Sequence, residues 1–171
     1  MKGAAIIALD AVGTALFVLT AVLAAAFFTN TLQWVGAITA IALFTVGVFC
    51  FLWSYFHAVQ RSRTDEISVT TLYFLGGEPT PPRVRRAMLA LLAVQLITAT
   101  ATTFARLDGP DGKPGSSLAV GFLVPMFGFG LNGLWAAFHG AFPERRRAES
   151  PANSSKSVNA GASIGQNDDH G

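Results

Sequence analysis

The sequence contains little charge and almost no cysteine. Asp, Glu, Lys and Arg make up 13% of its 171 residues, whereas a typical soluble domain contains about 25%. The single cysteine, Cys50, cannot form a disulfide within the chain or a CxxC site for zinc or thiol redox chemistry. Of the three histidines, we expect His57 and His139 to be solvated rather than metal-bound, and we expect no cofactor. The net charge of +2 gives no reason to expect a nucleic-acid partner.

The sequence contains several long apolar runs. Hydrophobic residues make up 51% of the chain, and a spanning helix needs roughly 20 mostly apolar residues. Inside lipid the backbone must satisfy its own hydrogen bonds, so each run is predicted to be a helix. The runs cover residues 3–28, 33–57, 87–104 and 117–138. The sequence therefore predicts an all-α polytopic membrane protein, with a bundle of four transmembrane helices in residues 1–142.

The remaining residues form a central loop (58–86) and a C-terminal tail (143–171). The tail is small and polar, and it cannot bury enough apolar surface to offset the entropy of ordering it. We therefore predict that the tail is disordered. The central loop contains an apolar stretch from Ile67 to Leu75 that is too short to span a membrane. This stretch has three open interpretations: it lies in the membrane interface, docks a partner, or packs back on the bundle.

Lys and Arg are concentrated on one side of the predicted bundle. An even number of spans places both termini and the central loop on the same side. That side carries ten basic residues, which are Lys2, Arg61, Arg63, Arg83, Arg85, Arg86, Arg145, Arg146, Arg147 and Lys156. The opposite side carries Arg106 and Lys113. The positive-inside rule then predicts a multi-pass protein of the plasma membrane with both termini, the loop and the tail in the cytoplasm.

The arginines near the predicted inner membrane surface are candidate contacts for anionic phospholipid headgroups, each worth about 1 kcal/mol. They are Arg61, Arg63, Arg83, Arg85, Arg86, Arg145, Arg146 and Arg147. A competing interpretation of the N-terminus is a cleavable signal peptide, because Lys2 and an apolar run precede three small residues at 24–26. The run is longer than a usual signal sequence and contains Asp10, so we favour a retained span.

Asp10 is the one charged residue inside the four predicted spans. A charged side chain in a membrane helix costs about 2.5 to 3.5 kcal/mol on insertion scales, so it usually faces a polar partner or water. Gln95 and Asn132 lie at similar depths in the third and fourth spans, and we predict a buried polar layer of Asp10, Gln95 and Asn132. Two alternatives stay open. The carboxyl group reaches interfacial water, or it handles protons or cations.

The fourth span contains three glycines with the spacing GxGxxG, at Gly128, Gly130 and Gly133. A dinucleotide site needs a strand before those glycines, and none is predicted here. We expect them instead to let a neighbouring helix approach closely. Pro125 is expected to kink the same span, because it removes one helical hydrogen bond.

Two segments resemble an uncharacterised family of small actinobacterial integral membrane proteins with four helices. They are RSRTDEISVTTLYFL, at 61–75, and LVPMFGFGLNGLW, at 123–135. The resemblance covers the helices and not the tail. No activity is established in that family, so the resemblance implies four spans in a plasma membrane and transfers no site residue.

The sequence shows no paired carboxylates, no metal cluster and no nucleophile with a neighbouring base. We therefore expect a non-enzymatic accessory or scaffold component in the lipid bilayer, with a second copy or another membrane protein as candidate partner. The alternative is a small homo-oligomeric transporter or channel that uses Asp10 as its proton or cation site. With four predicted helices and one acidic residue in the first helix, the chain is loosely similar to small multidrug exporters. Those proteins carry a glutamate in their first helix, where this chain has Asp10. An intramembrane enzyme acting on lipid is a third alternative.

Overall fold

The computed structural model describes residues 3–63, 65, 67–77, 80–108 and 117–143. Its helices are α1 (Ala4–Phe27), α2 (Asn30–Arg61), α3 (Val69–Tyr73), α4 (Pro82–Ala105), the 3-10 helix η1 (Ser117–Leu123) and α5 (Pro125–His139). Four segments are long and apolar enough to cross a membrane: α1, α2, α4 and the span formed by η1 and α5. No strand occurs in these residues. The prediction of an all-α chain with four candidate spans is confirmed.

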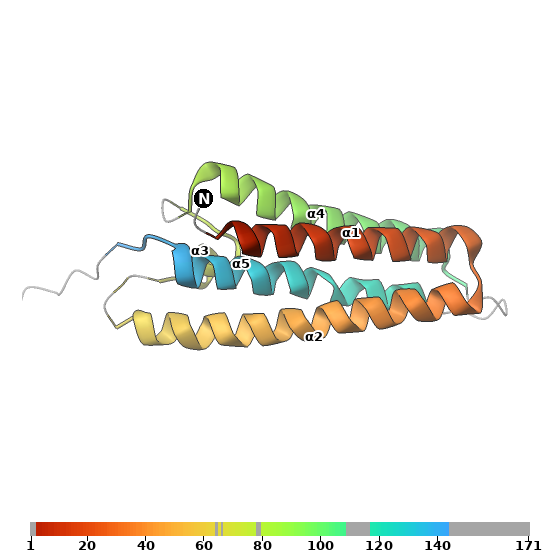
Figure 1. Cartoon of the computed structure of the whole chain (residues 1–171), viewed down its shortest axis with the longest axis horizontal. Helices are drawn as coiled ribbons and strands as arrows, with labels where there is room; N and C mark the ends of the chain where they lie inside the picture. Colours follow the sequence, from red (N-terminus) through yellow and green to blue (C-terminus); the bar gives the residue numbers. More distant parts are fainter. Residues whose placement is uncertain (1–2, 64, 66, 78–79, 109–116, 144–171) are drawn as a thin grey trace, which may run out of the picture.

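The long helices lie side by side, and α5 is the central one (Figure 1). It packs against α2 on one side and against α1 and α4 on the other. Nine of its fifteen residues are buried. The outer helices α1, α2 and α4 instead present many apolar side chains outward, among them Val12, Phe49 and Ile97. The N-terminus, the start of α4, α3 and the end of α5 all lie at one end of the bundle.

Two helices are longer than the apolar runs that predicted them. The hydroxyl group of Thr29 accepts a hydrogen bond from the backbone N–H of Leu32 at 3.4 Å, so this N-cap begins α2 before the predicted residue 33. The same helix continues to Arg61. Helix α4 begins at Pro82, ahead of the predicted residue 87. Proline is favoured at a first helical position because its missing N–H would have no helical partner there.

The fourth span consists of two helices of different type. The N–H of Val124 donates to the carbonyl oxygen of Gly121 at 3.0 Å, and the N–H of Phe127 donates to that of Val124 at 2.8 Å. This three-residue spacing is that of a tight 3-10 turn. Because Pro125 has no N–H, it cannot continue a four-residue ladder from the preceding residues. Pro125 therefore marks the change from η1 to α5.

The apolar stretch of the central loop packs back on the bundle. Leu72, Tyr73 and Leu75 are buried, and α3 packs against α5. The ring of Tyr73 stacks on that of Phe51 in α2, with 4.1 Å between the ring centroids, and its hydroxyl group donates to the carbonyl oxygen of Phe51 at 3.2 Å. Burial raises the pKa of this phenol, so it stays a neutral donor at physiological pH. Val69, the first residue of α3, is exposed.

Helices α2 and α5 are in close contact where Gly47 and Gly130 face each other. A Cβ atom on Gly130 would overlap the carbonyl oxygen of Gly47, and one on Gly47 would lie 2.5 Å from the backbone of Phe127. Both obstacles are backbone atoms, so no rotation of a side chain could make room. Small residues that let helix backbones pack this tightly are typical of helices in lipid.

Replacing Gly130 with alanine should therefore destabilise the bundle. We expect Gly130→Ala to lower the free energy of unfolding by about 2 kcal/mol or more, as overpacked substitutions do. The measurement is thermal unfolding of the full chain in detergent micelles. Gly36→Ala is the matched control, because its new Cβ atom would lie 3.5 Å from the nearest atom, Cβ of Ala24. Equal unfolding temperatures for the two variants would contradict this account of the contact.

Candidate functional site

Asp10, Thr14 and Gln95 form a buried polar cluster between α1 and α4. The side chains of Asp10 and Gln95 are 0% exposed. Nε2 of Gln95 donates to Oδ1 of Asp10 at 3.2 Å and to Oγ1 of Thr14 at 2.7 Å. Asp10 and Thr14 are four residues apart and share one face of α1, so a single amide group reaches both. The cluster thus joins α1 to α4 within the candidate spans.

Two buried acceptor atoms of this cluster have no hydrogen-bond partner. They are Oδ2 of Asp10 and Oε1 of Gln95. Among the described residues, Asp10 takes part in no ion pair with a basic side chain. A buried acceptor without a donor costs free energy. The cluster therefore has two acceptor atoms that remain available to further donors.

Asn132 has a different partner. Its Nδ2 donates to the backbone carbonyl oxygen of Tyr73 at 3.0 Å, so it joins α5 to α3. The structure thus brings two of the three predicted layer residues, Asp10 and Gln95, into contact and gives Asn132 a role at the central loop. Thr14 is an additional member of the first cluster. Its signal in the sequence is the four-residue spacing from Asp10.

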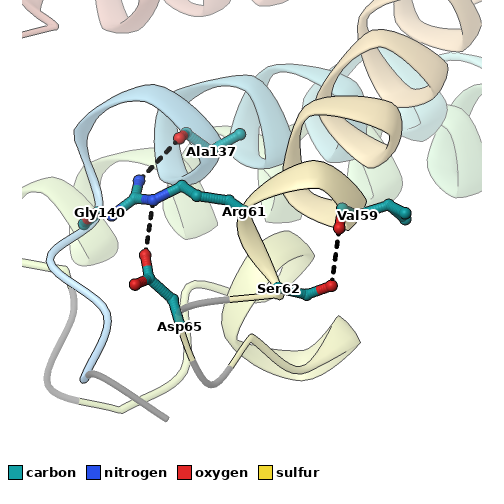
Figure 2. A network of polar contacts seen from close by, with 6 residues as sticks. All are labelled: Val59, Arg61, Ser62, Asp65, Ala137 and Gly140. Carbon is teal, nitrogen blue, oxygen red and sulfur yellow. Dashed lines mark hydrogen bonds and ion pairs between the residues drawn. The ribbon is translucent and has the colours of Figure 1, made fainter.

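Arg61 joins the end of α2 to the end of α5 (Figure 2). Its Nε donates to Oδ2 of Asp65 at 2.7 Å, and its two terminal nitrogens donate to the carbonyl oxygens of Ala137 at 3.1 Å and Gly140 at 3.3 Å. The last carbonyl groups of a helix lack intrahelical donors and carry partial negative charge, so a guanidinium group stabilises them. Only 33% of the Arg61 side chain is exposed. This candidate headgroup contact therefore bonds mainly to other parts of the protein.

The other candidate headgroup contacts differ in position. Arg63, Arg83 and Arg86 are exposed and Arg85 is partly exposed, at the same end of the bundle as Arg61. The remaining three, Arg145, Arg146 and Arg147, lie outside the described residues. The predicted disordered tail also lies outside them, apart from residue 143.

The two histidines are less solvated than expected. The ring of His57 stacks on Phe138 with 4.3 Å between centroids, and that of His139 stacks on Trp135 with 5.6 Å between centroids. Nδ1 of His139 is buried and has no hydrogen-bond partner. Within the described part of the chain, no three His, Cys, Asp or Glu side chains group together as a metal site.

Replacing Gln95 with leucine tests the contact between α1 and α4. We expect Gln95→Leu to lower the free energy of unfolding by about 1 to 3 kcal/mol, because the acceptors of Asp10 and Thr14 lose their donor while they stay buried. Denaturant unfolding in mixed micelles measures the change. Thr100→Val is the control on the same helix, since its hydroxyl group donates to the carbonyl oxygen of Leu96, one turn earlier. A Gln95→Leu protein as stable as this control would show that the cluster does not hold the bundle together.

These polar side chains all connect one element to another. Gln95 links α4 to α1, Asn132 links α5 to α3, and Arg61 links α2 to α5. None of the three contacts pairs a nucleophile with a base. No model of a known protein family, no curated protein and no solved structure matches the chain.

Proposed function

We propose that this protein is a non-enzymatic accessory or scaffold component of the plasma membrane. The observation that carries the proposal is the bond from Gln95 to both Asp10 and Thr14, which uses the polar groups of two spans to hold them together. At the end of the bundle, Asn132 joins α5 to α3 and Arg61 joins α2 to α5. A chain whose polar side chains fix its helices relative to one another suits a protein that positions lipids or partner proteins.

Membrane insertion is supported by the outward faces of the helices. Phe49 and Phe56 of α2 are 67% and 64% exposed, and α1 and α4 carry similar exposed apolar side chains. Apolar patches of this extent are unfavourable in water and favourable against lipid chains. The lipid bilayer is therefore the first partner, and a second copy of the chain or another membrane protein is the candidate for the second.

The distribution of charge supports an orientation with the basic end in the cytoplasm. Arg63, Arg83, Arg85 and Arg86 lie at the end that also holds the N-terminus and the end of α5, while Arg106 lies at the opposite end. Basic residues are retained on the cytoplasmic side during insertion. Both termini would then be cytoplasmic, and the exposed arginines would contact anionic phospholipid headgroups.

Labelling of single cysteines in intact cells tests this orientation. Cys50 is first replaced by alanine, and a cysteine is then introduced as Leu107→Cys at one end or Arg63→Cys at the other, both at exposed positions. A membrane-impermeant maleimide should label Leu107→Cys in intact cells. It should label Arg63→Cys only after the membrane is permeabilised. The reverse pattern would contradict the proposed orientation.

A small homo-oligomeric transporter or channel is the second candidate. One observation favours it: Oδ2 of Asp10 is buried inside a candidate span and has no hydrogen-bond partner. An acidic group in that setting is a common site for proton or cation handling. Such a role requires the carboxyl group to gain and lose a charge, whereas a structural role requires only its acceptor oxygen.

Asp10→Asn separates the two functions, because asparagine keeps the acceptor for Gln95 and cannot release a proton. We expect the variant to unfold within about 1 kcal/mol of the wild type and to co-purify with the same companions from native membranes in mild detergent. We also expect wild-type proteoliposomes to show no proton flux that depends on Asp10. A flux that is present in the wild type and lost in a stably folded Asp10→Asn protein would replace the scaffold proposal with the transporter.

A further inference from the structure

Residues 67–77 of the central loop, which we call the strap, contain a helix that is too short to be stable alone. Helix α3 has five residues, whereas isolated helices shorter than about 12 residues are marginal in water. Ser68 and Thr71 form a capping box at its start, and the N–H of Phe74 donates to the carbonyl oxygen of Thr70 at 3.1 Å. These bonds last only while the strap lies on the bundle. Hydrogen exchange of the Phe74 amide therefore reports whether the strap is docked.

The end of the strap that follows α3 is held on the bundle under backbone strain. Leu75 has a φ angle of 54°, in the left-handed region that residues with a side chain rarely adopt. Its side chain is fully buried, and a conformation of this kind persists only where the surrounding structure holds it. The ring of Phe74 packs edge-on against Phe129 of α5, with 5.2 Å between centroids. Lifting the strap would therefore break apolar contacts and release strain at the same time.

The opposite end of the strap is packed less closely. A cavity of about 130 Å³ lies between α2 and α3, and Val69 at the start of α3 is 64% exposed. Side chains that border empty space lose the attraction of the missing neighbours. Two residues before the strap, Oδ2 of Asp65 forms an ion pair with Nε of Arg61 at 2.7 Å. This ion pair therefore supports an end of the strap to which packing contributes little.

The same guanidinium group holds the end of α5 (Figure 2). The terminal nitrogens of Arg61 donate to the carbonyl oxygens of Ala137 and Gly140, and its Cζ lies 5.3 Å from the ring centroid of Phe142. The N–H groups of a guanidinium lie in one rigid plane. A rotation that breaks the bond to Asp65 therefore also displaces the bonds to the two carbonyl groups.

We propose that Arg61 couples the strap to the C-terminal segment 137–142, so that the two loosen together. When the strap lifts, Asp65 leaves the guanidinium group, which then turns away from the end of α5. The coupling is reciprocal, because a free-energy link between two segments acts in both directions. The tail follows this segment in the sequence, so a partner that binds the strap would also change how the tail is attached to the bundle. The inference goes beyond the scaffold role, since it concerns a movement within this chain.

Amide hydrogen exchange of the full chain, followed by NMR in detergent micelles, tests the coupling. Asp65→Asn keeps the size of the side chain and removes its charge, so it weakens the ion pair with Arg61. We expect the N–H groups of Phe74 and Gly140 each to exchange at least about threefold faster than in the wild type. In the structure they donate to the carbonyl oxygens of Thr70 and Ala136. Faster exchange at only one of the two amides, or at neither, would overturn the proposal.

Arg63→Gln is the matched control. Arg63 is exposed and lies two residues from Arg61, so the variant removes a charge at the same end of the bundle. Exchange at Phe74 and Gly140 should stay within about twofold of the wild type. If Arg63→Gln accelerates both amides as much as Asp65→Asn does, the effect is one of total charge and the coupling does not exist.

A double variant shows whether the effect passes through Arg61. In an Arg61→Gln background the link is already lost, so adding Asp65→Asn should not accelerate exchange at Gly140 further. A further acceleration would show that Arg61 does not carry the coupling, and the proposal would be wrong. If Arg61→Gln does not fold, the comparison of Asp65→Asn with Arg63→Gln still decides the question.

Discussion

The close approach of α5 to α2 at Gly130 and Gly47 is the contact on which the rest of the bundle depends. Lipid chains are as apolar as leucine, so helices in a membrane are held together by packing and polar contacts and not by the hydrophobic effect. A Cβ atom on either glycine would meet backbone atoms of the other helix. Because neither residue has one, α5 can occupy the centre of the bundle, with α2 on one side and α1 and α4 on the other.

The position of α5 determines which polar groups meet. Its last turns lie against the central loop, where Asn132 bonds the backbone of Tyr73 and Arg61 bonds the final carbonyl groups of the helix. Farther from that end, Gly128 lies against Gln95 of α4, which in turn bonds Asp10 and Thr14 of α1. Each polar contact therefore connects helices that α5 has brought together. Such contacts are worth a modest amount of free energy each, but they specify one arrangement of otherwise uniformly apolar helices.

The basic end and the interior of the bundle carry different polar groups. The basic end holds the exposed arginines and the start of α4, which no side chain caps. Exposed arginines favour anions, which fits the proposed contact with anionic headgroups. The interior of the bundle instead holds a carboxyl group bonded by an amide. The described polar side chains are thus divided between contacts that join helices and exposed arginines at one end of the bundle.

The sequence alone predicts the number of candidate spans, the position of Asp10 within the first and the excess of arginine at one end, because length, hydropathy and charge are properties of consecutive residues. It also places Gln95 near the depth of Asp10, since each helical residue rises about 1.5 Å. It does not predict that Thr14 joins them, that Asn132 bonds the loop, or that Arg61 caps α5. Those contacts depend on how each helix is rotated about its axis. Apolar residues cover every side of these helices, so the sequence pattern does not show which face meets a neighbour, and the fit between the glycines of α2 and α5 decides it.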